Sequence, residues 1–351
     1  MIGELGQLLV STRFSSIYRK GDRAIKVTST GSVVKPHDPT TELALLRRLQ
    51  EPGNPFIIEL LSFDTKQGDV ILQFPYIELN LYQYLLEQYQ KRCWNPYLLD
   101  GDKSTQGSQR INKLPLQQAV GFFQQLAKAL QYIHSKGIIH RDVKLQNVLV
   151  DVNSGSTVPR LVIIDFGIAY HPEVSEETPN NKITDVSTSI YKAPELLFSV
   201  KNYTGAVDVW ALLVVVSQFF QTSSASEKFV PAFVDDGSEE LEEGSDIRLI
   251  SSIFHSLGIP TLQQWPEVRD HGSPAFEGMF GASGDGRYLV NQSQTDQREK
   301  CLHLFPRLQE VSEPSKTHLV DCLLRMMPFE SSKRTTAGEI VTLLHECNGQ
   351  I

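Results

Sequence analysis

The chain has 351 residues, 40% of them hydrophobic, which is enough to bury one large core or two packed lobes. Its formal net charge of −8 argues against broad binding to nucleic acid or to an anionic membrane, because both need a basic face. The four cysteines lack zinc-site spacing and the N-terminus lacks a basic region before its apolar residues. We therefore expect no secretory signal, thiols that stay reduced, and a protein of the cytoplasm and nucleus.

The first part of the chain is dominated by short strand-like segments separated by turns at 20–22 and 67–69. One helix interrupts them over 39–50, with Asp38 as its predicted N-cap and Pro39 at its first position. The predicted strands are 6–10, 15–19, 23–27, 57–63 and 68–74.

After about residue 80 the pattern becomes helical, with apolar residues every three to four positions over 81–90 and 114–137. The apolar run from 209 to 216 is too short to cross a bilayer and predicts a buried helix. Two polar insertions are expected, near 91–113 and near 222–246. The second carries seven acids, which fit either a solvated loop or a docking surface for basic partners.

Three short segments carry residues suited to phosphoryl transfer, a reaction catalysed mainly by positioning and charge neutralisation. They are HRDVKLQN at 140–147, LVIIDFG at 161–167 and YKAPE at 191–195. In the first segment, Asp142 can accept the proton of the attacking hydroxyl. Lys144, two residues later, can neutralise the phosphoryl group in transfer.

Two further pairs of residues complete the predicted site. Asn147 and Asp165 offer the hard oxygen ligands that Mg²⁺ prefers. Lys26 can hold the α- and β-phosphates of ATP, oriented by Glu42 on the single helix of the first part. Any one of these elements could arise by chance, but all of them in this order predict an enzyme that uses ATP and Mg²⁺.

This set of motifs resembles that of the eukaryotic protein kinases, and the resemblance runs from Ala24 to Arg334. It implies an α+β, bilobal protein kinase fold, with a small β-rich N-lobe at 1–76 and a larger α-helical C-lobe at 77–351. Lys144 resembles the serine/threonine branch of the family rather than the tyrosine branch.

The resemblance also implies roles for residues outside the motifs. Thr188 would brace Asp142 and Lys144, and Asp208 would hold the backbone of the catalytic loop. Glu195 and Arg334 would form a buried ion pair in the second lobe. The residues that the resemblance places around the nucleotide are Val10, Ile17, Ala24, the gatekeeper Phe74 and the hinge residues Pro75, Tyr76 and Ile77.

Two features narrow the branch of the family. The segment 244–268 resembles the insert of cyclin-dependent kinases and their relatives. Together with ITDVSTSIYKAPELLF and FVDDGS, it is most similar to the monomeric cyclin-dependent-kinase-activating kinases of budding yeasts. The resemblance implies transfer to an activation-loop threonine of a cyclin-dependent kinase, and hence control of cell-cycle progression. The predicted helix begins only about one turn before Glu42, so we expect a monomer that needs no cyclin.

The kinase pattern also has a glycine-rich loop, which this chain lacks. Its three glycine positions fall at Val10, Thr12 and Ser15, and the first two are β-branched and stiff. Backbone N–H groups there would approach phosphate less closely. Arg13 could supply charge to the phosphates or could be an exposed turn residue, and both interpretations stay open.

The retained Mg²⁺ ligands and base predict an active enzyme rather than a pseudokinase. An alternative is a catalytically weak scaffold that binds cyclin-dependent kinases without phosphorylating them. Arg141 belongs to the type of residue that binds an activation-loop phosphate in many kinases. Because the segment 171–185 carries its own acids, we expect activity without that phosphate. The acids are Glu173, Glu176, Glu177 and Asp185.

Overall fold

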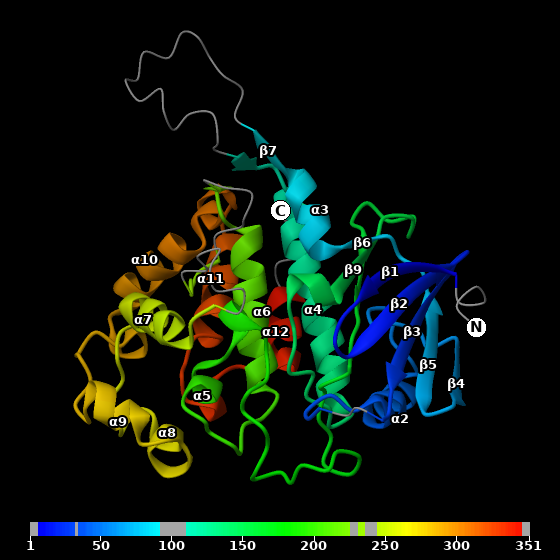
Figure 1. Cartoon of the computed structure of the whole chain (residues 1–351). Coiled ribbons are helices and arrows are strands. Elements are labelled where there is room, and N and C mark those ends of the chain that lie inside the picture. The colour runs from blue at the N-terminus through cyan, green and yellow to red at the C-terminus, as the bar shows by residue number, and fades with distance from the viewer. Residues whose placement is uncertain (1–5, 32–33, 92–109, 225–230, 236–243, 346–351) are drawn as a thin grey trace.

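A computed structural model describes residues 6–31, 34–91, 110–224, 231–235 and 244–345. A five-stranded antiparallel sheet and one helix form the first part, and a larger body of helices forms the second (Figure 1). Both predicted insertions lie largely outside the described residues. The first is described only at 91 and 110–113, and the second only at 222–224, 231–235 and 244–246.

The first sheet has the strand order β1-β2-β3-β5-β4. Its strands are β1 (Gln7–Ser11), β2 (Ser15–Lys20), β3 (Arg23–Ser29), β4 (Ser62–Lys66) and β5 (Asp69–Pro75). Helix α2 (Pro39–Leu49) packs near β5 through its buried leucines. The Asp38 carboxylate accepts hydrogen bonds from the backbone N–H groups of residues 40 and 41, at 2.8 and 3.3 Å. The predicted N-cap and the proline at the first helical position are confirmed.

The strand predicted over 57–63 is wrong over its first five residues, because β4 begins only at Ser62. Ile57 and Ile58 are both buried, although neighbouring residues of a strand should point to opposite faces. The N–H of Ile58 donates to the carbonyl oxygen of Ile163, 3.0 Å away, instead of pairing with β5. The apolar run therefore packs against β10 (Arg160–Ile163), in the second part of the molecule.

The second part begins after β5. The next strand, β6 (Leu79–Asn80), belongs to a different sheet, with the order β10-β9-β6. We therefore propose that the first lobe ends at Tyr76. The remaining strands are β7 (Tyr89–Lys91), β8 (Arg110–Asn112), β9 (Val148–Asp151) and β11 (Ser223–Ser224).

Helices make up most of this second part (Figure 1). They are α3 (Leu81–Gln88), α4 (Leu116–Ser135), α5 (Pro194–Leu197), α6 (Ala206–Phe219), α7 (Asp246–Leu257), α8 (Pro266–His271), α9 (Ala275–Phe280), α10 (Gln294–Leu304), α11 (Ser315–Arg325) and α12 (Ala337–His345). Among the described residues there are also five short 3₁₀ helices, η1 (Leu145–Asn147), η2 (Ser189–Tyr191), η3 (Leu289–Asn291), η4 (Pro306–Glu310) and η5 (Ser331–Lys333).

Helix α6 forms the centre of the helical part, and every residue from Val207 to Phe219 is buried. It packs against α4, which in turn packs against α12. The predicted buried helix is therefore confirmed. Across the described ranges, no helix is both long and apolar enough to cross a membrane.

One ion pair lies inside this core. Arg334 donates to both carboxylate oxygens of Glu195, at 2.7 and 3.0 Å, and neither side chain is exposed. Arg334 also donates to the backbone carbonyls of Ala206 and Pro328. These contacts join α5, the start of α6 and the segment before α12, as the family resemblance implied.

Replacing Arg334 with alanine should leave Glu195 buried without its partner. We expect the free energy of unfolding to fall by about 3–5 kcal/mol, measured by urea denaturation. The matched control is Arg287→Ala, because Arg287 is 72% exposed in its 3.0 Å pair with Asp285. The control should cost less than about 1 kcal/mol. Equal losses in the two variants would contradict the structural role assigned to the buried pair.

Candidate active site

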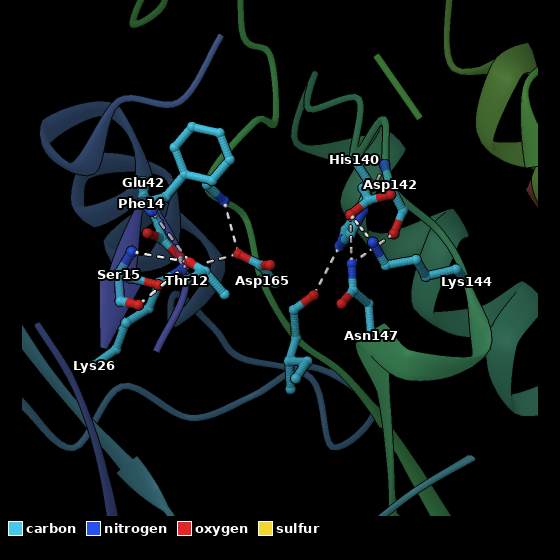
Figure 2. A network of polar contacts seen from close by, with 12 residues as sticks. Thr12, Phe14, Ser15, Lys26, Glu42, His140, Asp142, Lys144, Asn147 and Asp165 are labelled. Carbon is cyan, nitrogen blue, oxygen red and sulfur yellow. Dashed lines mark hydrogen bonds and ion pairs between the residues drawn. The ribbon is translucent and has the colours of Figure 1, made fainter. Parts of the chain in front are cut away.

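Lys26 connects the two parts of the molecule. Its Nζ lies 2.7 Å from Glu42 Oε1 on α2 and 2.9 Å from Asp165 Oδ1, two residues after β10 (Figure 2). Burial lowers the pKa of Lys26, but the charges of Asp165 and Glu42 outweigh burial and raise the pKa above its usual value. The ammonium group therefore stays charged, and the predicted Lys26–Glu42 contact is present.

Asp165 is held as a carboxylate at the edge of this cluster. Burial raises its pKa, but the charge and hydrogen bond of Lys26 hold the pKa well below its usual range. The side chain is still 43% exposed, so one face is open to a ligand. Its backbone has a φ of 65°, in the left-handed region that residues other than glycine rarely adopt. Such strain is found at functional sites, where the surrounding structure maintains it.

The second cluster surrounds Asp142 (Figure 2). Asn147 Nδ2 donates to Asp142 Oδ2 at 2.8 Å, and Lys144 Nζ lies 2.8 Å from the same oxygen. Thr188 Oγ1 donates to Asp142 Oδ1 at 2.7 Å and accepts a hydrogen bond from Lys144 at 2.7 Å. The bracing role that the resemblance implied for Thr188 therefore has its geometry. Two hydrogen bonds and one ion pair therefore orient the Asp142 carboxylate, which can accept a proton.

Asp208 on α6 holds the backbone of the loop that carries Asp142. Asp208 accepts hydrogen bonds from the backbone N–H groups of His140 and Arg141, at 2.9 and 2.8 Å. Burial raises the pKa of Asp208, but the hydrogen bond and charge of His134 hold it below the usual value. These bonds help to hold Arg141 at a φ of 68°.

The strand register places the predicted nucleotide-contacting residues on one face of the first sheet. Val10 is paired with Ile17, and Ile17 is paired with Lys26. Ala24 lies two residues before Lys26 and is paired with Phe74. Paired residues, and residues two apart in one strand, point to the same face. These four side chains therefore share the face of Lys26.

The resemblance implied that the hinge residues Pro75, Tyr76 and Ile77 surround the nucleotide, but two of them line a cavity that does not include Lys26. Pro75 and Ile77 line a cavity of about 280 Å³ whose described lining includes Asn54 and Arg160 but not Lys26. The guanidinium carbon of Arg19 lies 4.0 Å from the ring centre of Tyr76. Contact of Ile77 with adenine therefore stays a prediction.

The residues present fit Mg²⁺. Both hydrogen bonds of the Asn147 amide are donated by its nitrogen, to Asp142, which leaves the amide oxygen as a possible metal ligand. Asp165 can add a carboxylate. Within the described ranges, no three His, Cys, Asp or Glu side chains form a metal site by themselves. Mg²⁺ needs no such group, because it is commonly held by one or two protein ligands together with substrate phosphates and water.

The four acidic residues of the activation segment (171–185) each contact a different basic side chain. Glu177 binds the buried Arg141 with two hydrogen bonds of 2.9 Å, and its Oε2 also accepts from the N–H of Ile183 at 2.7 Å. The other pairs are Glu173 with Arg48 at 2.6 Å, Asp185 with Lys192 at 3.5 Å, and Glu176 with Lys35. The sequence identified the acids and Arg141 but could not match them, because three of the four basic partners, Arg141, Lys35 and Arg48, lie more than thirty positions away in the chain.

Residues 11–343 match the family model described as protein kinase domain. The chain belongs to the protein kinase family. The predicted α+β kinase fold, with a β-rich first part and a helical second part, is thereby confirmed. The family match and the similarity to a serine/threonine-protein kinase also identify the enzyme as an ATP-dependent protein kinase of the serine/threonine class.

Three similar proteins illustrate the range of the resemblance. The serine/threonine-protein kinase CAK1 of Saccharomyces cerevisiae is 39% identical over 356 residues, which cover 97% of each chain. Cyclin-dependent kinase D-1 of Arabidopsis thaliana is 29% identical over 65% of this chain and 46% of its own length. A chain in the ATPγS-bound CAK complex of Chaetomium thermophilum has a TM-score of 0.64 and 22% identity, covering 96% of this chain and 88% of its own. At that identity it supports the fold alone.

Replacing Asp142 or Asp165 with asparagine should abolish most phosphoryl transfer. We expect kcat to fall about 10²- to 10⁴-fold for Asp142→Asn, the usual effect of losing a general base, and severely for Asp165→Asn. Both variants should keep the thermal stability of the parent enzyme to within a few degrees. The control Asp64→Asn changes an exposed carboxylate on β4 and should be fully active. Near-normal turnover by either site variant would refute the assignment.

Proposed function

We propose that this kinase transfers the γ-phosphate of ATP to an activation-loop threonine of a cyclin-dependent kinase and thereby controls cell-cycle progression. The similarity to the kinase named CAK1 supports this, because it extends over 97% of both chains. The segment 244–268, with its resemblance to the insert of cyclin-dependent kinases, supports the same branch.

In the proposed mechanism the protein positions groups more than it takes part in covalent chemistry. Asp142 receives the proton of the substrate hydroxyl, and the hydrogen bonds from Thr188 and Asn147 fix the direction of its carboxylate. Lys144 places a positive charge 2.8 Å from that carboxylate, where the phosphoryl group passes. Lys26 holds the non-transferred phosphates.

Asn147 and Asp165 would hold Mg²⁺, which neutralises charge on the phosphates when it is bound. The remaining proposed contacts of ATP are with the sheet face formed by Val10, Ile17, Ala24 and Phe74, and with Ile77 of the hinge.

We also propose that the chain is active without a phosphate on its activation segment. The contact that carries this proposal is the two-bonded pair between Arg141 and Glu177. Arg141 has only 1% of its side chain exposed, so a missing counter-charge would be costly. Glu177 supplies in the chain itself the negative charge that a phosphorylated residue supplies in many kinases.

We further propose that the kinase needs no cyclin. The pair between Arg48 of α2 and Glu173 ties α2 to the activation segment, and Lys26 holds Glu42 of α2 toward the site. Helix α2 is thus held inward by contacts within the chain. We propose a monomer in the cytoplasm and nucleus, with cyclin-dependent kinases as its protein substrates.

The described ends of the acidic stretch make contacts within the chain. Asp235 accepts a hydrogen bond from the Ser189 hydroxyl, and Asp246 pairs with Lys192 at 3.1 Å. Ser189 follows Thr188, which donates to Asp142. The two interpretations of the stretch, a solvated loop or a docking surface for basic partners, both stay open.

The substrate can be tested by incubating the purified enzyme with ATP carrying a labelled γ-phosphate and a purified cyclin-dependent kinase. We expect label on the wild-type substrate and none on a substrate with alanine in place of the activation-loop threonine. The Asp142→Asn enzyme should transfer no label. Binding without any label would favour the scaffold alternative, and label on the alanine substrate would refute the proposed target residue.

Neutralising Glu177 should separate intrinsic activation from general charge effects. We expect Glu177→Gln to lose about 10- to 100-fold in rate, because hydrogen bonds to a charged group contribute about 1.5–3 kcal/mol. Glu176→Gln is the neighbouring control, since both Glu176 and its partner Lys35 are largely exposed. It should keep its rate within about twofold. Mass spectrometry must show both proteins unphosphorylated, and full activity of Glu177→Gln would contradict the proposal.

A further inference from the structure

The turn between β1 and β2 uses its own backbone donors. The N–H groups of Phe14 and Ser15 both donate to Thr12 Oγ1 at 3.2 Å, and the N–H of Thr12 donates to the carbonyl of Ser15 at 2.9 Å (Figure 2). Thr12 stands at a position where the kinase pattern has glycine. Its hydroxyl thus occupies two donors that a glycine loop would leave for phosphate.

The side chains of this turn make a contact outside the sheet. The Phe14 ring is stacked on the His37 ring, with 3.6 Å between centroids and 21° between planes. The guanidinium carbon of Arg13 lies 4.5 Å from the Phe14 ring centre. Phe14 and His37 are half-buried, whereas Arg13 is exposed. The stack therefore joins the tip of the β1–β2 hairpin to the residue before the N-cap of α2.

His37 lies one residue before a contact with the site. Burial lowers the pKa of its imidazole below the usual value, so the ring that stacks on Phe14 is favoured in its neutral form. The next residue, Asp38, donates its N–H to the carbonyl of Gly167 at 3.2 Å. The stack thus connects the hairpin tip to the segment that carries Asp165 and to the helix that carries Glu42.

We propose that the Phe14–His37 stack is a latch that positions the β1–β2 hairpin over the phosphates of ATP. The stack would hold the hairpin in place, as hydrogen bonds from glycine-loop amides to phosphate do in other kinases. A turn fixed in advance loses less conformational freedom when the nucleotide binds. Phe14 and His37 are therefore positioning residues for ATP, and Arg13 acts by covering the Phe14 ring. The inference rests on ATP binding by a protein kinase and not on the protein substrate proposed above.

The latch is tested by nucleotide binding. Phe14→Ala and His37→Ala should each raise the dissociation constant of Mg-ADP, measured by calorimetry, and the KM for ATP by about 3- to 10-fold, the range expected for one aromatic pair. The kcat at saturating ATP and the KM for protein substrate should change less than about twofold. Melting temperatures without nucleotide should match the parent enzyme.

Ring-retaining variants distinguish stacking from other roles. Phe14→Tyr and His37→Phe should bind Mg-ADP within about twofold of the parent, and the double alanine variant should be little worse than either single one. The control is Phe63→Ala. Phe63 lies on β4, at the opposite edge of the sheet, where its exposed ring contacts Arg47 of α2, and its removal should have no effect.

Three results would overturn the latch. Unchanged affinity in both alanine variants would show that the stack does not position the hairpin. Tighter binding by Phe14→Ala would show that the ring obstructs the phosphate site. A loss in His37→Phe as large as in His37→Ala would assign the effect to the imidazole nitrogens instead of the stack.

Discussion

The ammonium group of Lys26, shared between two carboxylates, is the interaction on which the site depends. It joins a strand of the first sheet, helix α2 through Glu42, and the segment after β10 through Asp165. Burying the charges of Lys26 and Glu42 is costly unless each is paired, and Lys26 also pairs with the partly exposed Asp165, so the three elements keep their positions together. Asp165 stays ionised in this arrangement, and its open side can bind a metal ion. The face of the sheet that carries Lys26 is thereby joined to the segment that carries Asp165.

The same physical rule governs the activation segment. Arg141 is buried next to Asp142, the proposed catalytic base, and Glu177 is the counter-charge that offsets the cost of its burial. Glu173 extends the rule to α2 through Arg48. In many kinases the negative charge comes from phosphorylation of the activation segment, and the contacts to the helix come from a second subunit. In this chain they come from four acids within thirteen residues, which is why we propose activity as a single, unmodified chain.

Much of this was predictable from sequence, because the chemistry of phosphoryl transfer needs particular residues at nearly fixed separations. Asp142, Asn147 and Asp165 are recognisable for that reason, and Asp38 is recognisable because capping is local. The pairing of Arg141 with Glu177, and the stacking of Phe14 on His37, were not predictable. Each depends on where the fold brings distant segments. The apolar run at Ile57 misled for a related reason, since burial between the two parts of the molecule resembles burial in a strand.

If one unphosphorylated chain is a complete protein kinase, the specific activity of enzyme made in bacteria can be followed across a size-exclusion run, with light scattering and mass spectrometry on every fraction. We expect the activity to follow the 39.5 kDa monomer, carrying no phosphate. Activity that appears only after phosphorylation, or only in fractions containing a second subunit, would contradict it.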